Sequence, residues 1–230
     1  MDADEAHSTA APHPPSGRPR AFGMFGDDLS RVIALSDGVF AFALTLLALS
    51  LTVPVFSTAG QSSGQVSSHL AFLLQRDYNA FFGYVFAFVM IAVWWIGHHR
   101  AFDHIARYTS GLVWINMAFL IQIAVMPFVL SVFNDYSDTQ VAVALFAGLQ
   151  MSLGITISLL WDFARRWHLL KPKVSEAVVQ YLSRRNLFSA GVFAVSIGIT
   201  FVSLTAAEVS WVFVFVLQRL LDLRTPAPVV

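Results

Sequence analysis

Asp37 is a carboxylate inside an apolar segment, a position where a charged group needs a partner. Burying it in a membrane costs several kcal/mol unless another helix or water stabilises the charge. Arg31 lies six residues earlier, and this spacing places the two side chains on different faces of a helix. Three interpretations follow for Asp37: an interfacial charge solvated by lipid headgroups, a structural contact to another helix, or part of an ion path.

A second polar group, His98 with His99 and Asp103, follows the next apolar segment. Adjacent histidines point about 100° apart on a helix, so they do not bind one metal ion together, and no metal site is predicted. His99 and Asp103 are four residues apart and are expected to pair along the helix. One histidine is then expected to hydrogen-bond inward while the other faces the interface.

Asn116 and Gln122 are uncharged polar residues in a third apolar segment, and we expect them to hydrogen-bond between helices. No catalytic constellation accompanies them. The sequence has no Gly-x-Ser-x-Gly, no His-Glu-x-x-His and no phosphate-binding loop, so neither an enzyme nor a cofactor is predicted. It also lacks the Thr-Val-Gly-Tyr-Gly filter of potassium channels that use a pore loop.

The composition indicates which kind of protein must position these residues. Of 230 residues, 57% are hydrophobic and 12% charged, with a mean hydropathy of +0.66. Soluble domains contain about 45–50% apolar and about 25% charged residues, so the composition excludes a soluble or disordered protein. The net charge is zero, which gives no field to attract nucleic acid, and there is no cysteine. The remaining class is an integral membrane protein of helices.

Six apolar segments are candidates for membrane spans, and Gln218 and Arg219 make the sixth the weakest. They are predicted at 32–54, 80–97, 110–133, 139–161, 186–207 and 209–221. Residues 1–30 are predicted to be a disordered cytoplasmic tail, 31–223 a six-helix transmembrane domain, and 224–230 a cytoplasmic C-terminal tail. If all six segments cross, thirteen of the 14 basic residues lie on the side of the N-terminus and only Arg76 on the other. This asymmetry places both termini in the cytoplasm.

The first span carries a mixed face. Steps of three or four residues place Gly38, Phe42, Thr45 and Leu49 on one side, with Leu46 beside them. A helix that faced only lipid would show plain aliphatic residues. The pattern is typical either of a helix packed inside a bundle, which periodicity alone favours, or of a pore wall with a hydrophobic constriction and a ring of hydroxyl groups.

Three motifs occur in order along the first three spans. The first is the run Arg31-Val-Ile-Ala-Leu35-Ser36-Asp37. Trp95-x-x-His98-His99-x-x-Phe102 follows in the second span, and Trp114-x-Asn116 with Pro127-Phe128 in the third. These motifs resemble the bacterial members of the transmembrane protein 175 family, which are potassium-selective channels and whose first motif reads Arg-x-x-x-Phe-Ser-Asp, with Leu35 at the Phe position here. The motifs occur in the family's order and cover about half of the chain.

The resemblance implies an all-α subunit of six spans without a pore loop, and a homotetramer in which span 1 lines a central pore. Matched by position, the pore constriction is formed by Phe42, Leu46 and Leu49, and Thr45 supplies the selectivity hydroxyl. The resemblance also implies a network that braces span 1, with the members Arg31, Ser36, Asp37, Trp95, His98, His99 and Asn116.

We therefore expect a channel of the inner cell membrane that is modestly selective for potassium over sodium and needs no cofactor. Its partners are further copies of itself, permeant potassium and the lipid bilayer. The alternative is a small ion or proton-coupled transporter in which Asp37 and His98 or His99 act as relay groups. Unitary current separates the two functions, because a channel passes ions fast enough to resolve single openings.

Overall fold

A computed structural model describes residues 24–26, 29–49, 51, 55–76 and 78–213. Two short strands and six long helices make up most of this part of the chain, and a shorter helix follows the last of them. In chain order the elements are β1 (Met24–Gly26), α1 (Ser30–Ala48), α2 (Ser63–Arg76), α3 (Tyr78–Asp103), β2 (Tyr108–Thr109), α4 (Ser110–Asp135), α5 (Gln140–Arg166), α6 (Glu176–Ile199) and the short helix Leu204–Phe213.

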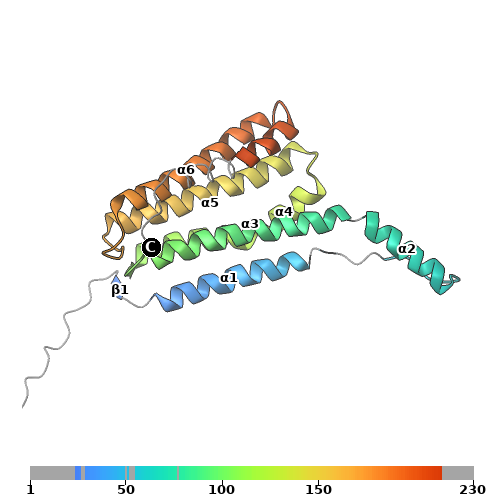
Figure 1. Cartoon of the computed structure of the whole chain (residues 1–230), viewed down its shortest axis with the longest axis horizontal. Coiled ribbons are helices and arrows are strands. Elements are labelled where there is room, and N and C mark those ends of the chain that lie inside the picture. The colour runs from blue at the N-terminus through green and yellow to red at the C-terminus, as the bar shows by residue number, and fades with distance from the viewer. Residues whose placement is uncertain (1–23, 27–28, 50, 52–54, 77, 214–230) are drawn as a thin grey trace, which may run out of the picture.

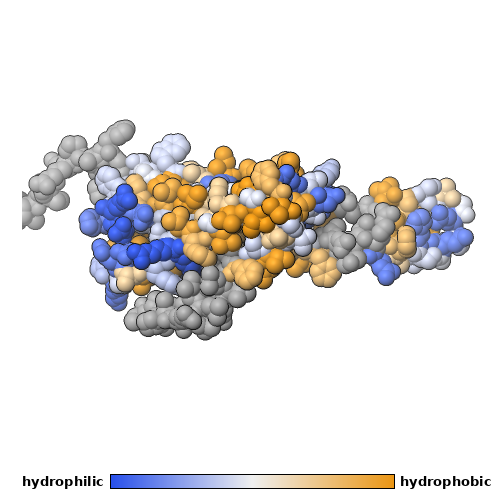
Figure 2. Space-filling view, turned by 90° about the horizontal axis from the view of Figure 1, so that it is seen from above, coloured by the Kyte–Doolittle hydropathy of each residue, from blue (hydrophilic) through white to orange (hydrophobic). Residues whose placement is uncertain are grey.

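Among the residues that the structure describes, four helices are long and apolar enough to cross a membrane: α1, most of α3, α4 and α5. The 19 residues of α1 extend about 28 Å, close to the thickness of a hydrocarbon core of about 30 Å. Seen from above, Figure 2 shows hydrophobic residues gathered over the middle of the bundle and hydrophilic residues toward its ends. The chain is a multi-pass membrane protein.

The bundle is built outward from α4. Helices α1, α3 and α5 each pack against α4, and α6 packs against the far side of α5 (Figure 1). The largest fully buried side chains include Phe119 and Met126 of α4, Phe40 of α1 and Phe146 of α5. One side of α1 therefore belongs to the core, while α1 itself lies at the edge of the subunit.

Several predicted spans have other boundaries than the helices, among them the first and the fifth. The first span was expected to reach Pro54, but α1 ends at Ala48, and residues 52–54 lie outside the described part. The fifth was expected to continue to Ala207, and this end is wrong because α6 stops at Ile199. The amide nitrogens of Val202 and Ser203 bond to the Ile199 carbonyl, and the Ser203 hydroxyl accepts from the amide of Ala206, which starts a new helix.

The short helix Leu204–Phe213 folds back toward the bundle. The indole nitrogen of Trp211 donates to the Ser196 hydroxyl of α6 at 2.9 Å, and its ring packs on Phe146 and Phe193. This helix contains the start of the predicted sixth span. The rest of that span, with Arg219, and the C-terminal tail lie outside the described residues.

Two local elements have no counterpart among the sequence predictions. Helix α2 follows the first span, and it was missed because its apolar run, Leu70–Leu74, is too short to predict a membrane span. Strand β1 pairs in antiparallel fashion with β2. The prediction of a disordered tail over residues 1–30 is thus wrong at Met24–Gly26, where backbone hydrogen bonds to Tyr108–Thr109 order the chain. Residues 1–23 lie outside the described part.

The connections at one end of the bundle are tied together. The amide of Ala106 donates to the Leu169 carbonyl at 2.8 Å, and the amide of Lys171 donates to the His104 carbonyl at 2.9 Å. With the β1–β2 pair, these bonds join the N-terminal segment, the α3–α4 connection and the α5–α6 connection at the end of the molecule where β1 lies (Figure 1). The basic residues Arg107, Arg165, Arg166, Lys171 and Lys173 belong to these connections or the adjoining helix ends.

Candidate functional site: the two faces of α1

Helix α1 has one buried face and one exposed face. Ser36, Phe40, Ala43 and Leu47 are buried against the rest of the bundle. On the opposite side, Phe42 and Leu49 are 65% and 76% exposed, and Thr45, Leu46 and Gly38 are exposed as well. The exposed face is therefore the one that the sequence singled out, and its side chains are exposed with respect to all the residues that the structure describes.

After Asp37, α1 has no further charged side chain, so its exposed face from Gly38 to Leu49 is apolar except for the hydroxyl group of Thr45. Thr45 Oγ1 lies 2.8 Å from the carbonyl oxygen of Phe42 and 3.1 Å from that of Ala41. The hydroxyl proton is used within the helix by these bonds. The oxygen lone pairs of Thr45 are thus left available on the exposed side, where a cation or water can be coordinated.

A buried chain of hydrogen bonds joins α1 to α3 and α4 behind this face. His98 Nε2 lies 2.8 Å from Asn116 Oδ1, and Asn116 Nδ2 donates to the Ser36 hydroxyl at 3.0 Å. Ser36 in turn donates to the Val32 carbonyl at 2.9 Å. All three side chains are almost completely buried. Each of these hydrogen bonds pairs a donor with an acceptor, so the buried polar atoms that form them are satisfied. The bonds also fix the position of α1 relative to α3 and α4.

Aromatic rings enclose the imidazole of His98. Its ring stacks on Phe119 with centroids 5.3 Å apart, and the rings of Phe40 and Phe102 lie at 5.6 and 4.6 Å. Phe40 belongs to α1 and Phe119 to α4, so the same histidine also organises the apolar contact between these helices. Sequence analysis missed Phe40 and Phe119, because a phenylalanine in a membrane span gives no signal of its own.

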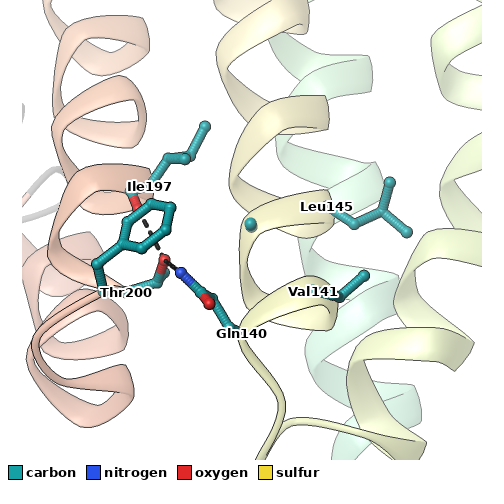
Figure 3. A pocket seen from close by; sticks show the side chains of 7 residues that line it. Gln140, Val141, Leu145, Ile197 and Thr200 are labelled. Carbon is teal, nitrogen blue, oxygen red and sulfur yellow. Dashed lines mark hydrogen bonds between the residues drawn. The ribbon is translucent and has the colours of Figure 1, made fainter.

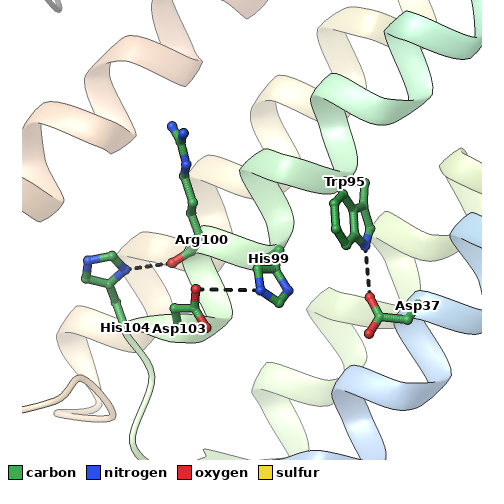
Figure 4. A network of polar contacts seen from close by, with 6 residues as sticks. All are labelled: Asp37, Trp95, His99, Arg100, Asp103 and His104. Carbon is green, nitrogen blue, oxygen red and sulfur yellow. Dashed lines mark hydrogen bonds and ion pairs between the residues drawn. The ribbon is translucent and has the colours of Figure 1, made fainter. Parts of the chain in front are cut away.

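Asp37 has a different partner. Trp95 Nε1 donates to Asp37 Oδ1 at 2.9 Å, which joins α1 to α3 at the edge of the buried chain (Figure 4). His99 stacks on the Trp95 indole with centroids 5.4 Å apart, and its Nε2 lies 3.7 Å from Asp103 Oδ2. The predicted pairing of His99 with Asp103 is confirmed, and Asp37 makes the structural contact to another helix that was one of its three interpretations.

Six of the seven residues of the expected bracing network thus divide into two groups. Ser36, His98 and Asn116 form the buried chain, whereas Asp37, Trp95 and His99 form a second, more exposed cluster. Arg31 joins neither group: its side chain is exposed, and no ion pair connects it with Asp37 in the described part of the chain.

This arrangement predicts the outcome of two double-mutant cycles. For Asp37→Asn with Trp95→Phe, we expect a coupling of about 0.5–1.5 kcal/mol, because both single changes weaken one hydrogen bond. For Arg31→Ala with Asp37→Asn, we expect the two losses to add. Thermal unfolding of the purified variants measures both cycles. Strict additivity in the first cycle, or clear coupling in the second, would show that the contacts are assigned incorrectly.

Further hydrogen bonds connect the remaining helices. Gln122 Nε2 donates to Thr156 Oγ1, and the Ser152 hydroxyl donates to Gln122 Oε1, both at 2.9 Å. The prediction that Asn116 and Gln122 bond between helices is confirmed. Trp94 Nε1 donates to Gln150 Oε1 at 2.7 Å and so ties α3 to α5, a contact that the sequence did not reveal.

Two other features bear on what the site can bind. Within the described residues, no three His, Cys, Asp or Glu side chains gather as metal ligands. A cavity of about 420 Å³ lies between α5 and α6 at the end of the bundle opposite β1, where Gln140 Nε2 donates to Thr200 Oγ1 at 3.3 Å (Figure 3). Its other lining residues are apolar, among them Val141, Leu145 and Ile197, and it is remote from α1.

Comparison with known proteins places these features in a family. Residues 31–127 match the family described as "Endosomal/lysosomal potassium channel TMEM175". A potassium channel of Chamaesiphon minutus is 31% identical over 180 residues, which cover 76% of this chain and 86% of that protein. A potassium channel of Streptomyces collinus is 28% identical over 182 residues, which cover 77% of this chain and 84% of that protein.

The fold agrees with these matches. The crystal structure of a lysosomal potassium-selective channel TMEM175 homolog from Chamaesiphon minutus superposes with a TM-score of 0.63 at 26% sequence identity. The superposition covers 86% of this chain and 97% of the chain in that structure. The helices that carry the buried chain and the exposed α1 face thus belong to an arrangement seen in a channel.

Proposed function

The chain belongs to the bacterial branch of the TMEM175 family, and from that premise we propose that it is a potassium-selective channel whose pore is lined by the exposed face of α1. The family consists of ion channels and not of enzymes, and a cation channel is the function that its bacterial relatives share. The observation that carries the pore assignment is the division of α1 into a braced, buried face and an uncharged, exposed face.

The pore requires several subunits. One copy of α1 cannot enclose a path for water and ions, whereas copies arranged around a closed symmetry axis can do so. We propose a homotetramer in which the exposed faces of four α1 helices meet. Phe42, Leu46 and Leu49 then form a hydrophobic constriction, which closes the pore when water leaves it.

Thr45 supplies the polar element of this pore. It lies between Phe42 and Leu49 on the exposed face, and its hydroxyl proton is already used by the helix. Four such oxygens around an axis replace part of the hydration shell of a cation, and the absence of an acidic ring leaves the attraction weak. A weak replacement of water implies a modest preference for potassium over sodium.

The pore assignment makes a direct electrical prediction. In planar bilayers that contain the purified protein, a gradient of potassium against sodium should give a reversal potential shifted from zero toward the potassium equilibrium potential. Single openings should be resolved, because an open pore passes ions faster than a carrier turns over. A reversal potential at zero in this gradient would contradict potassium selectivity, and transport without unitary current would favour the transporter.

The relay alternative has less support from the geometry. His98 bonds to Asn116, Asp37 bonds to Trp95, and in the described part of the chain no hydrogen bond joins the two groups. Aromatic rings also surround His98 and separate it from the exposed face of α1. A proton relay would need a continuous path from one of these groups to the next.

We also propose that both termini lie in the cytoplasm and that the protein resides in the inner membrane. The basic connections at the end of the molecule where β1 lies support this orientation, because cytoplasmic loops carry the excess of Lys and Arg. A reporter that fluoresces only in the cytoplasm, fused after Val230, should be active. A periplasm-specific reporter active at that site would mean that the chain crosses the membrane an odd number of times.

A further inference from the structure

Helix α1 carries one charged side chain on the same side as the residues that we assign to the pore. Arg31, Phe42 and Leu49 are all exposed. Phe42 and Leu49 follow Arg31 by 11 and 18 residues, which rotates them by about 20° and about 0° around a helix of 3.6 residues per turn. Leu35, one turn after Arg31, is exposed as well. The side chains of Arg31, Leu35, Phe42 and Leu49 therefore form one stripe along α1.

Arg31 lies at the start of this stripe. It belongs to the first turn of α1, at the end of the bundle where β1 lies (Figure 1). At a rise of 1.5 Å per residue, it is about 16 Å from Phe42 along the helix axis. In the orientation proposed above, this end of the bundle faces the cytoplasm. Arg31 is thus placed at the inner mouth of the ion path, on the cytoplasmic side of the constriction.

The described residues do not offset the charge of Arg31. The first turn of α1 contains no acidic residue, and in the described part of the chain no ion pair includes Arg31. Asp37 lies about 120° away around the helix and accepts a hydrogen bond from Trp95. The N-terminus of α1, where the helix dipole is positive, is at the same end. Each subunit therefore presents positive charge on the pore side of this mouth.

From this geometry we propose that four Arg31 side chains form a ring of positive charge at the inner mouth and limit the conductance of the channel. The ring depends on the tetrameric pore proposed above. Positive charge repels cations, so the potassium concentration at the mouth is lower than in the cytoplasm. Ions that leave the cell enter the pore through this mouth, and outward current is therefore reduced more than inward current.

The unaltered channel provides the first test. Its single-channel conductance is recorded in symmetrical KCl between about 0.05 M and about 1 M, a range over which the screening length falls from more than about 10 Å to about 3 Å. We expect conductance to rise more steeply than the KCl concentration at the dilute end, because added salt screens the ring. Asp27 and Asp28 precede the helix and lie outside the described residues. A conductance above proportion in dilute KCl would show a net negative mouth and would contradict the proposal.

Charge variants of Arg31 provide the second test. In about 0.05 M KCl, we expect Arg31→Gln to raise the outward unitary current about threefold and Arg31→Glu to raise it further. Arg31→Lys keeps the charge and should conduct as the unaltered channel does. The matched control is Arg166→Gln, which removes an exposed charge at the same end of the bundle. Arg166 ends α5, which packs against α4 and α6, and its loss should leave the current unchanged.

The salt dependence of the variants separates charge from shape. In about 1 M KCl the gain of Arg31→Gln should nearly vanish, and a gain that persists there would indicate a wider mouth instead of a weaker field. Equal currents in Arg31→Gln and the unaltered channel at low salt, or equal gains in Arg31→Gln and Arg166→Gln, would also overturn the proposal. If the Arg31 variants conduct as before while a thiol reagent still blocks Thr45→Cys, the ring is wrong and the pore assignment stands. A channel that Thr45→Cys labelling leaves open would remove the pore assignment and the ring together.

Discussion

Replacing Phe42 with Ala is expected to raise the single-channel conductance about fivefold and to reduce the discrimination between potassium and sodium. Phe42 is 65% exposed on the face of α1 that we assign to the pore. Four smaller side chains at this level leave a wider constriction that water fills more readily. A barrier lower by about 1 kcal/mol accelerates passage about fivefold.

Controls separate this effect from a loss of packing. Phe128 of α4 is 63% exposed but lies on another helix, so Phe128→Ala should leave conductance and selectivity unchanged. Leu47 is on the buried face of α1, and Leu47→Ala should instead destabilise the protein by about 2–5 kcal/mol. Unchanged currents in well-folded Phe42→Ala tetramers would remove Phe42 from the pore.

Replacing Asn116 with Leu is expected to destabilise the protein by about 1–3 kcal/mol and to reduce the number of conducting channels. The change removes both hydrogen bonds of Asn116 and leaves His98 and Ser36 buried without their partner. Hydrogen bonds between membrane helices contribute about 0.6 kcal/mol on average, so the low end of this range applies if the bundle relaxes. Thermal unfolding and the fraction of protein that stays assembled measure the loss.

Gln122→Leu is the matched control for this prediction. Gln122 is also an amide of α4 that bonds to another helix, but its partners Ser152 and Thr156 belong to α5. We expect a similar loss of stability without a change in the ion selectivity of the channels that form. If Gln122→Leu alters selectivity as strongly as Asn116→Leu, the bracing of α1 is not specific to the buried chain.

The sequence indicated which polar residues contact other helices, but it did not predict all of their partners. Asp37, His98 and Asn116 stand out because burying a polar group in an apolar segment costs free energy unless the group has a hydrogen-bond partner. Their pairing depends on how α1, α3 and α4 are rotated about their axes, and no local pattern contains this information. Trp95 and Asp37 are 58 residues apart in the sequence, and only the packing of two helices brings them together.

Hydropathy alone did not predict the helix break after Ile199 or strand β1. The break after Ile199 arises because the Ser203 side chain starts a new helix, although the apolar run continues through Ala207. Strand β1 pairs with Tyr108–Thr109 through backbone hydrogen bonds, and the polar, proline-rich composition of this segment does not predict such a pairing. The residues on the exposed face of α1, in contrast, were predictable, because side chains three or four positions apart lie on the same side of any α-helix.

The absence of cysteine from the chain allows the pore assignment to be tested directly. Thr45→Cys places a single thiol on the exposed face of α1, and Phe128→Cys places one on the exposed surface of α4 as a control. A charged, water-soluble thiol reagent is added while current is recorded across a bilayer. The account predicts an irreversible loss of current for Thr45→Cys and none for Phe128→Cys. Labelled Thr45→Cys protein that conducts as before would show that ions do not pass along this face.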